Sequence, residues 1–310
     1  MSGAPISNFV LILTAAIWGF AFVAQRKGME TLDPFTFNAL RFALGTGFLY
    51  LLKLILKKGK GVHEGVSSGK PMLLLGLILF IAASLQQFGI VWTSAGNAGF
   101  ITGLYVLFVP LIGLFRAQKL RLSVIGSVVL AVAGLYVINL GADLNMSIGN
   151  AWVLVSAVFF AIHVQMVDKL SKLHSAIDLA MLQFSVCAIL SFGFAGAHHL
   201  IKMGSSMEVN LLVSNIISAS LPIFYGGIMS VGIAYTLQIF AQKRVQPTTA
   251  AIILCSEGLI ALFGGWLLLS EKIGLSTLLG AFLLLTAMLL SILRRGGKVF
   301  LIDKKGTVKT

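Results

Sequence analysis

Charged side chains and cysteine are scarce in this sequence of 310 residues. Only 11% of the residues are Asp, Glu, Lys or Arg, 58% are hydrophobic, and the mean hydropathy is +0.98. A water-soluble globule is typically about 45–50% apolar and about 25% charged, so these values exclude a soluble protein. The two cysteines, Cys187 and Cys255, both lie inside apolar runs and predict no disulfide framework.

Motifs of soluble enzymes are also missing. The sequence has no Walker A motif, no dinucleotide-binding glycine signature and no HExxH zinc motif. Residues 65–69 fit the Gly-x-Ser-x-Gly pattern of serine hydrolases, but they lie in a Lys-rich connection and not in a strand-to-helix turn. His198 and His199, at the end of an apolar run, lack further ligands at useful spacing. We therefore expect no catalytic residues, no cofactor and no metal.

Long apolar runs dominate the chain, each close to the length of about 20 residues that a transmembrane helix needs. They leave only short connections, so there is no room for a separate soluble domain. The predicted fold class is an all-α integral membrane protein embedded in the lipid bilayer. The ten predicted spans are residues 8–25, 34–56, 71–93, 97–116, 122–140, 150–167, 176–197, 220–242, 248–269 and 275–293.

The net charge of +13 would suggest a nucleic-acid partner if the protein were soluble. Here the basic residues sort onto alternate connections. Seventeen Lys and Arg fall on one side, including the C-terminal tail, and four fall on the other. By the positive-inside rule we expect both termini in the cytoplasm, and we expect no nucleic-acid partner. The expected location is a bacterial inner (plasma) membrane.

The two halves of the chain are similar to each other. At an offset of 142 residues, the tripeptide Leu-Arg-Phe at 40–42 aligns with Leu-Gln-Phe at 182–184. Because each copy has an odd number of spans, the second copy enters the membrane from the opposite side. We predict two inverted-topology five-helix repeats, 8–140 and 150–293, around a central cavity, followed by a basic cytoplasmic tail at 294–310. Other aligned pairs are Asn8 and Asn150, Lys27 and Lys169, Gly76 and Gly227, Gln87 and Gln238, Gly113 and Gly264, and Gln118 and Glu271.

Several motifs resemble those of one transporter family. They are Trp18-Gly19, Leu40-Arg41-Phe42, the stretch 94–102, Pro110, Ser256-Glu257 and the stretch 269–272. With these motifs the chain is similar to the EamA-type branch of the drug/metabolite transporter superfamily, up to about residue 294. The resemblance implies transport and leaves the substrate open, since members move amino acids, nucleotide sugars, other metabolites and drugs. Gln118 stands at a span end where the first copy of the family often has Glu.

Glu257 is an acidic residue near the middle of a predicted span, about 15 Å from the start of that span at a rise of about 1.5 Å per residue. An ionisable residue in the hydrocarbon region is a functional candidate by default. Glu257 would pair with a substrate amine or carry a proton. The alternative is a structural carboxyl group that braces a break in the helix near Ser256 and Gly258, and both interpretations stay open.

Two further ionisable residues lie within spans. Arg41 is about 10 Å deep, where a guanidinium can hold a carboxylate or phosphate bidentately. We favour a structural role, in which Arg41 snorkels outward or pairs with helix-end carbonyl groups. His163 replaces Ala21 of the first copy and is interpreted either as a cavity residue with a transport role or as a hydrogen-bonded structural histidine.

Uncharged polar side chains complete the predicted cavity or, alternatively, make interhelical hydrogen bonds. Trp18 lies too deep for an interfacial belt, so we predict that it forms a cavity wall or a stacking surface. Ser84, Gln86 and Tyr225 belong to the same polar group. The candidate cavity residues are Trp18, Asn38, Gln87, Asn97, Tyr105, His163, Tyr235, Gln238 and Glu257, and the candidates for charge or coupling are Glu257, Arg41 and His163.

The expected function is a secondary transporter or facilitator that exports small amphipathic metabolites, such as amino acids, by alternating access. Coupling to protons and the oligomeric state stay open. Two other classes are weighed against it. A membrane-embedded lipid-modifying enzyme would need a nucleophile–base or metal constellation that the sequence does not offer, and a non-transporting membrane scaffold would need more extramembrane surface.

Overall fold

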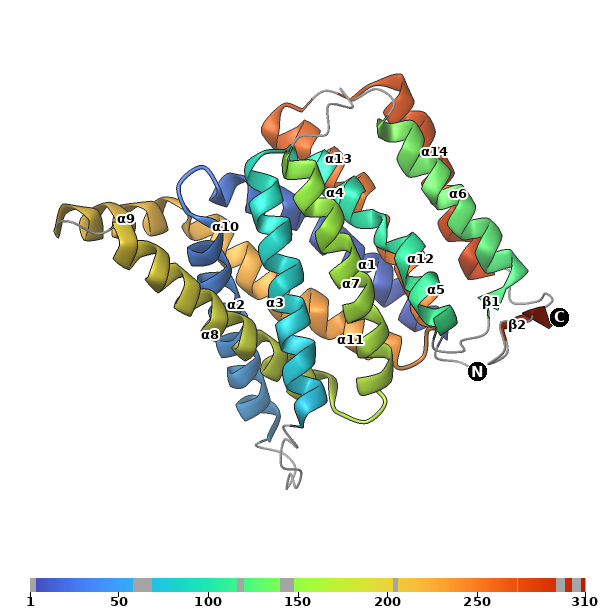
Figure 1. Ribbon diagram of the computed structural model, residues 1–310, viewed down its shortest axis with the longest axis horizontal. Coiled ribbons are helices and arrows are strands. Elements are labelled where there is room, and N and C mark those ends of the chain that lie inside the picture. The colour runs from blue at the N-terminus through green and yellow to red at the C-terminus, as the bar shows by residue number, and fades with distance from the viewer. Residues whose placement is uncertain are drawn as a thin grey trace.

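The computed structural model describes residues 4–57, 69–115, 120–139, 148–202, 206–271, 273–293, 299–302 and 308–309. These residues form a bundle that is almost entirely helical (Figure 1). Within them, eight helical segments are long and apolar enough to cross a membrane. An apolar segment of that length satisfies all its backbone hydrogen bonds internally only as a helix, which is why these runs fold as they do.

Each of the ten predicted spans contains a helix among the described residues. The first half contains α1 (Ala4–Gly28), α2 (Pro34–Lys57), α3 (Lys70–Val91), α4 (Ala95–Gly103), α5 (Tyr105–Phe115) and α6 (Leu122–Asn139). The second half contains α7 (Ile148–Leu170), α8 (Ala176–Lys202), α9 (Ser206–Ser218), α10 (Ser220–Phe224), the π-helix η1 (Tyr225–Tyr235), α11 (Thr236–Gln242), α12 (Pro247–Leu254), α13 (Glu257–Leu269) and α14 (Leu275–Leu293). In α6 and α14 the apolar stretches Ile125–Gly134 and Leu278–Leu290 are shorter than the other spans.

Two regions differ from the sequence prediction. The expected connection at 198–219 is largely helical, because α8 extends to Lys202 and α9 follows it, with Leu212 and Ile216 packed on a small apolar cluster. The predicted tail contains the short strands β2 (Val299–Ile302) and β3 (Val308–Lys309), and β2 also pairs with β1 (Leu120–Arg121). Some charged residues used to predict orientation lie outside the described residues: Lys58, Lys60, Arg116, Lys119, Lys272, Arg294, Arg295, Lys298, Lys304 and Lys305.

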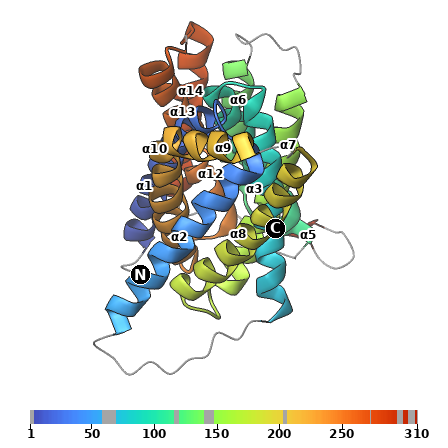
Figure 2. The ribbon, with the colours of Figure 1, turned by 90° about the vertical axis from the view of Figure 1, so that its left-hand side faces the viewer.

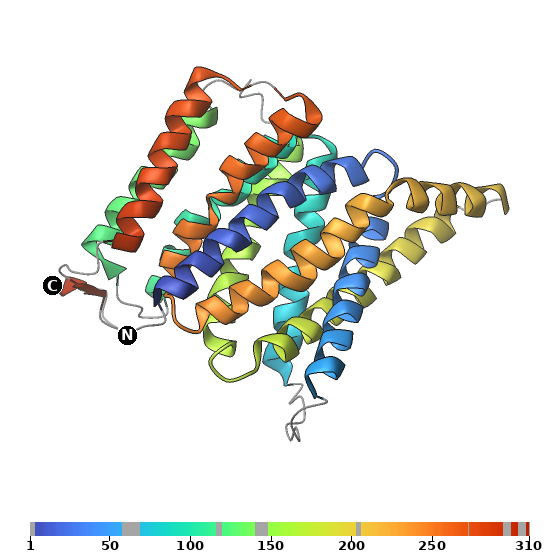
Figure 3. The same cartoon turned by 180° about the vertical axis from the view of Figure 1, so that it is seen from behind.

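The contacts between helices are symmetric: when two helices pack together, their counterparts in the other half also pack together. α2 packs against α8 and α6 against α14, so each of these helices contacts its counterpart in the other half. In the two broken spans α4 packs against α13 and α5 against α12, and these two pairs are exchanged when the halves are exchanged. Likewise α3 packs against α7, and α1 packs against η1. Figure 2 looks onto the side formed by α2, α8 and α9, whereas Figure 3 shows α1 between α13 and the α10–η1–α11 segment.

Two glycines at equivalent positions bring helices into backbone contact. A Cβ atom on Gly76 of α3 would lie 2.7 Å from the Cβ atom of Val186, and one on Gly227 of η1 would lie 2.8 Å from that of Leu44. Gly227 follows Gly76 by 151 residues, and Val186 follows Leu44 by 142. The same close approach therefore occurs twice, and each time it joins a helix of one half to a helix of the other.

Two spans are broken at equivalent places. The break between α4 and α5 falls at Leu104, and the break between α12 and α13 falls at Cys255 and Ser256. The Ser256 hydroxyl donates to the Ile253 carbonyl at 2.7 Å, and the Cys255 thiol donates to the Ile252 carbonyl at 3.0 Å. Side chains thus add hydrogen bonds to the backbone carbonyl groups beside the interruption. The break in the first half lies at Leu104, and α5 continues through Pro110, the kink site suggested by sequence.

Glu271 joins the broken spans at their far end. Its carboxylate accepts hydrogen bonds from the backbone amides of Ala95 at 2.9 Å and Gly96 at 3.2 Å, at the start of α4. A carboxylate at this position satisfies amides that have no partner within the helix and interacts favourably with the helix dipole. Gln118, the residue aligned with Glu271, lies outside the described residues.

Candidate functional site

A narrow polar cavity lies between the two halves of the bundle. Its volume is about 40 Å³, enough for roughly three water molecules. The broken spans contribute Tyr105 and Glu257, one at the first residue of α5 and one at the first residue of α13. The other polar or aromatic lining residues are Trp18, Phe22, Gln25, Arg41, Gln86, Thr102, Phe160, His163, Ser230, Tyr235 and Gln238.

Arg41 lies in the interior and lines the cavity. Its side chain is 4% exposed, and its Nε donates to Oδ1 of Asn38 at 2.9 Å. The guanidinium carbon lies 5.6 Å from the ring centre of Phe37 and 5.0 Å from that of Phe42, within the range of cation–π interactions. Arg41 therefore does not snorkel outward as we favoured from sequence, because Asn38 and the two rings hold its head group inside.

Glu257 brings an acidic group to the same cavity. It is 3% exposed and lies close enough to Tyr105 for an electrostatic interaction with its hydroxyl group. Within the described residues, no ion pair joins Glu257 to Arg41. The cavity thus holds a basic group from the first half and an acidic group from the second, and the two do not neutralise each other directly.

Aromatic rings form one wall of the cavity. The ring centres of Trp18 and Tyr235 are 4.6 Å apart in an edge-to-face arrangement, and the Trp18 indole nitrogen donates to the Ser230 carbonyl at 3.2 Å. His163 packs edge-on against Tyr235, with ring centres 5.9 Å apart. Its Nε2 atom also shares a hydrogen bond of 2.7 Å with Oε1 of Gln183. His163 therefore lines the cavity and is hydrogen-bonded, and its role in transport stays a prediction.

Three predicted cavity residues do not line it. Asn38 is buried beside the cavity, where it orients Arg41 and donates to the Ala83 carbonyl at 3.3 Å. Gln87 turns away and donates to the Gln25 carbonyl at 3.4 Å, because neighbouring residues of a helix point in different directions. Asn97 is partly exposed in the first turn of α4.

Three polar lining residues were not among the cavity residues considered from sequence. They are Gln25, Thr102 and Ser230, whereas Gln86 was named in the wider polar group and does line the cavity. Gln25 follows Trp18 by seven residues and therefore lies on the same face of α1, a spacing that could have identified it. The Oε1 atoms of Gln25 and Gln238 are buried and have no hydrogen-bond partner among the described residues. Such groups are costly unless water or a ligand satisfies them.

Broken apolar helices around a buried polar cavity define a multi-pass membrane transporter, because irregular backbone at membrane depth is tolerated where it lines a cavity. The EamA-like transporter family matches this chain twice, over residues 5–140 and 147–293. The chain belongs to this family, the EamA-type branch of the drug/metabolite transporter superfamily.

Known relatives are similar over nearly their whole length. An uncharacterized transporter of Archaeoglobus fulgidus is 30% identical over 285 residues, which cover 92% of this chain and 85% of the relative. The uncharacterized transporter YoaV of Bacillus subtilis is 25% identical over 291 residues, which cover 88% of this chain and 92% of YoaV. A protein of known crystal structure matches with a TM-score of 0.73 at 18% identity, covering 95% of this chain and 99% of that protein, and it supports the fold alone.

Proposed function

We propose that this protein is a secondary transporter or facilitator that exports small zwitterionic metabolites, such as amino acids. The observation that carries the proposal is the unpaired placement of Arg41 and Glu257 in one buried cavity. A carboxylate on the substrate would pair with Arg41 and an ammonium group with Glu257. Such a substrate neutralises both protein charges, which are costly to keep within a membrane.

The aromatic wall supports a substrate that is amphipathic. Trp18 and Tyr235 offer apolar surface and ring faces beside the two charges. The unsatisfied amide oxygens of Gln25 and Gln238 can accept further hydrogen bonds from an ammonium group. Together these groups match a molecule with two opposite charges at one end and an apolar side chain at the other.

Alternating access is the mechanism that we propose. The cavity volume of about 40 Å³ is far below the 300–1,000 Å³ of typical small-molecule pockets. The protein must therefore open to admit a metabolite, and the described conformation corresponds to a contracted state. The exchangeable helix pairing supports two inverted five-helix repeats whose relative rocking exposes the cavity to either side in turn.

The proposed orientation follows from the positive-inside rule. All ten spans, including α6 and α14, cross the membrane in this proposal, and both termini lie in the cytoplasm of a bacterial cell. Export in this proposal means transport outward across the inner membrane, a direction that the orientation of the termini does not itself determine. Proton coupling through Glu257 belongs to the same proposal, since a buried carboxyl group readily exchanges its charge for a proton.

Flux measurements test the proposed function directly. Purified protein is first screened by thermal shift against amino acids and related metabolites, because a bound ligand stabilises the folded state by mass action. Solutes that raise the Tm are then loaded into proteoliposomes, and their efflux is compared with that from protein-free liposomes. We expect accelerated flux for a zwitterionic solute and none for its amide or ester analogue, which keeps the ammonium group but lacks the carboxylate. Stabilisation without flux for every solute would contradict transport, and flux of solutes without a carboxylate would contradict the assigned substrate class.

A further inference from the structure

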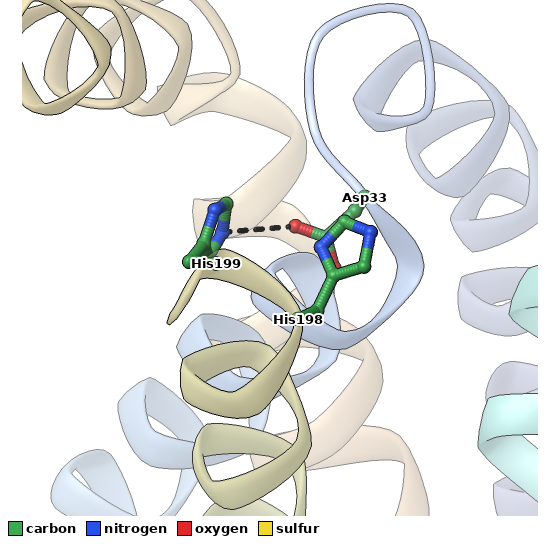
Figure 4. Close-up of side chains that lie close together, drawn as sticks. All are labelled: Asp33, His198 and His199. Carbon is green, nitrogen blue, oxygen red and sulfur yellow. Dashed lines mark ion pairs between the residues drawn. The ribbon is translucent and has the colours of Figure 1, made fainter. Parts of the chain in front are cut away.

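A second polar cluster lies away from the cavity, at one end of the α2–α8 pair. It consists of Asp33, which immediately precedes α2, and of His198 and His199 near the end of α8. Each residue offers one ligand atom, and these three atoms all lie within 4.8 Å of one another. Figure 4 shows the two imidazole rings on either side of the Asp33 carboxylate.

The Asp33 carboxylate is oriented by the helix that follows it. Its Oδ1 atom accepts hydrogen bonds from the backbone amides of Phe35 and Thr36, both at 3.0 Å. Its Oδ2 atom faces His199, with a distance of 3.3 Å to Nε2. One carboxylate oxygen is thus held by the start of α2, and the other is presented to the imidazoles. Hydrogen bonds that fix a ligand group in this way are typical of metal sites.

Among the described residues of this cluster, only the His198 imidazole has a buried nitrogen free for coordination, because His199 Nε2 already has partners. The Nε2 atom of His199 also lies 3.0 Å from the Thr36 hydroxyl oxygen. The Nδ1 atom of His198 is buried and has no hydrogen-bond partner in the described part of the chain. The ring centres are 5.5 Å apart, and the ring planes are inclined by 71°, so the rings do not stack face to face. A buried nitrogen without a partner is costly, and a metal ion would satisfy it.

We propose that Asp33, His198 and His199 bind a divalent transition-metal ion of the zinc class. Two imidazole nitrogens favour such ions over calcium or magnesium, which prefer oxygen ligands. Three protein ligands leave a fourth position for water. The sequence near His198 and His199 offers no third metal ligand. The fold supplies one, Asp33, which is distant in the sequence and immediately precedes α2.

Metal binding needs a small local rearrangement. Ligand atoms of a tetrahedral zinc site lie about 3.4 Å apart, given metal–ligand distances of about 2.0–2.1 Å. Side-chain rotation of the two histidines closes the present separation of up to 4.8 Å. The His199 Nε2 atom then binds the metal in place of a proton, so any proton that it carries is released.

The ion would cross-link two helices from different halves of the chain. It joins the start of α2 to the end of α8, whereas at the opposite end of the same pair Lys53 and Asp178 form an ion pair. Helices α2 and α8 would then be linked at both ends, by the metal ion at one and by the Lys53–Asp178 ion pair at the other. This inference stands on the cluster alone and does not depend on the proposed substrate or on transport.

Titration of purified full-length protein without a polyhistidine tag tests the site. We expect one Co²⁺ per chain, a visible absorption band typical of low coordination number, and displacement of Co²⁺ by Zn²⁺. Zn²⁺ at a hundredfold excess over its Kd should raise the Tm. The variants His198→Gln and His199→Gln should each lower Zn²⁺ affinity by about tenfold or more. Asp33→Asn should do the same while preserving folding, because Asn is as good an N-cap residue as Asp.

His174→Gln serves as the matched control, since His174 lies at the opposite end of α8 and outside the cluster. It should leave Co²⁺ and Zn²⁺ binding unchanged. Absence of saturable Co²⁺ binding by the unmodified protein would overturn the proposal. Binding that persists unchanged in the His198→Gln/His199→Gln double variant would overturn it equally, even if the protein binds metal elsewhere.

Discussion

Arg41 and Gln183 occupy equivalent positions in the two halves, 142 residues apart, yet only Arg41 carries a charge. Two other equivalent pairs combine an apolar residue in the first half with an ionisable residue in the second. They are Ala21 and His163, 142 residues apart, and Val106 and Glu257, 151 residues apart. By comparison, Gly76 and Gly227 are identical, and each makes the equivalent close contact with a helix of the other half.

The difference separates two kinds of position. A glycine at a backbone contact has little freedom, because any side chain would meet the neighbouring helix. A cavity residue faces a small space instead of a packed neighbour, so the two halves can contribute different groups to it. A symmetric scaffold therefore encloses an asymmetric site, as a substrate with two unlike ends requires.

The largest effect is expected from making the cavity more symmetric. Replacing Arg41 by Gln, the residue of the other half, should weaken transport of a zwitterionic solute by about 10- to 100-fold, the value of a lost hydrogen bond to a charged group. Glu257→Gln should weaken it similarly and also flatten the pH dependence of flux. The measurement is initial flux in proteoliposomes between pH 5 and pH 9.

The two variants serve as controls for each other. Arg41→Gln should retain the pH dependence, because it leaves the Glu257 carboxyl group in place. A pH profile that is unchanged in Glu257→Gln would contradict proton coupling through Glu257, while equal flux in both variants and in the unmodified protein would contradict the charge-pairing site.

The next effect concerns the shared scaffold. Gly76→Ala and Gly227→Ala should each lower the free energy of unfolding by about 1–3 kcal/mol, because the added methyl group overlaps Val186 or Leu44. Thermal unfolding in detergent measures the loss. Gly47→Ala in α2 is the control, since no atom lies within 4 Å of a Cβ placed there, and it should be neutral or slightly stabilising. A loss at only one of the two contact glycines would refute their equivalence.

The smallest effect is expected at the aromatic wall. Trp18→Phe introduces the residue that the second half has at Phe160, and it removes the hydrogen bond to the Ser230 carbonyl. A neutral hydrogen bond contributes about 1 kcal/mol, so the half-saturating substrate concentration should rise only a few-fold. Trp152→Phe, at a tryptophan that is 42% exposed, should change nothing. A complete loss of flux in Trp18→Phe would mean that the indole is essential.

The sequence predicted the helices and the duplication, because both leave patterns that extend over many residues. Apolar runs located the helices because a membrane span has few structural alternatives, and repeated offsets revealed the duplication. The short helix α9 was missed because its segment is shorter than a span. Gln86 and Gln87 show the limit for the site: both are polar and adjacent, and only packing decides that Gln86 faces the cavity. The break at Leu104 had no such polar signal and became visible only in the backbone.

The π-helix η1 has a further consequence for the wall of the cavity. Its counterpart in the first half lies within α3, which is a regular α-helix, so among the described residues this hydrogen-bonding pattern occurs in the second half alone. Each residue of an α-helix turns the chain by about 100°, and a π-turn accommodates one more residue than an α-turn. Shifting the hydrogen bonds of η1 by a single step would rotate α11, with Gln238, relative to α10 without breaking the span. Such a shift would change how Gln238 faces the cavity relative to the residues that precede η1.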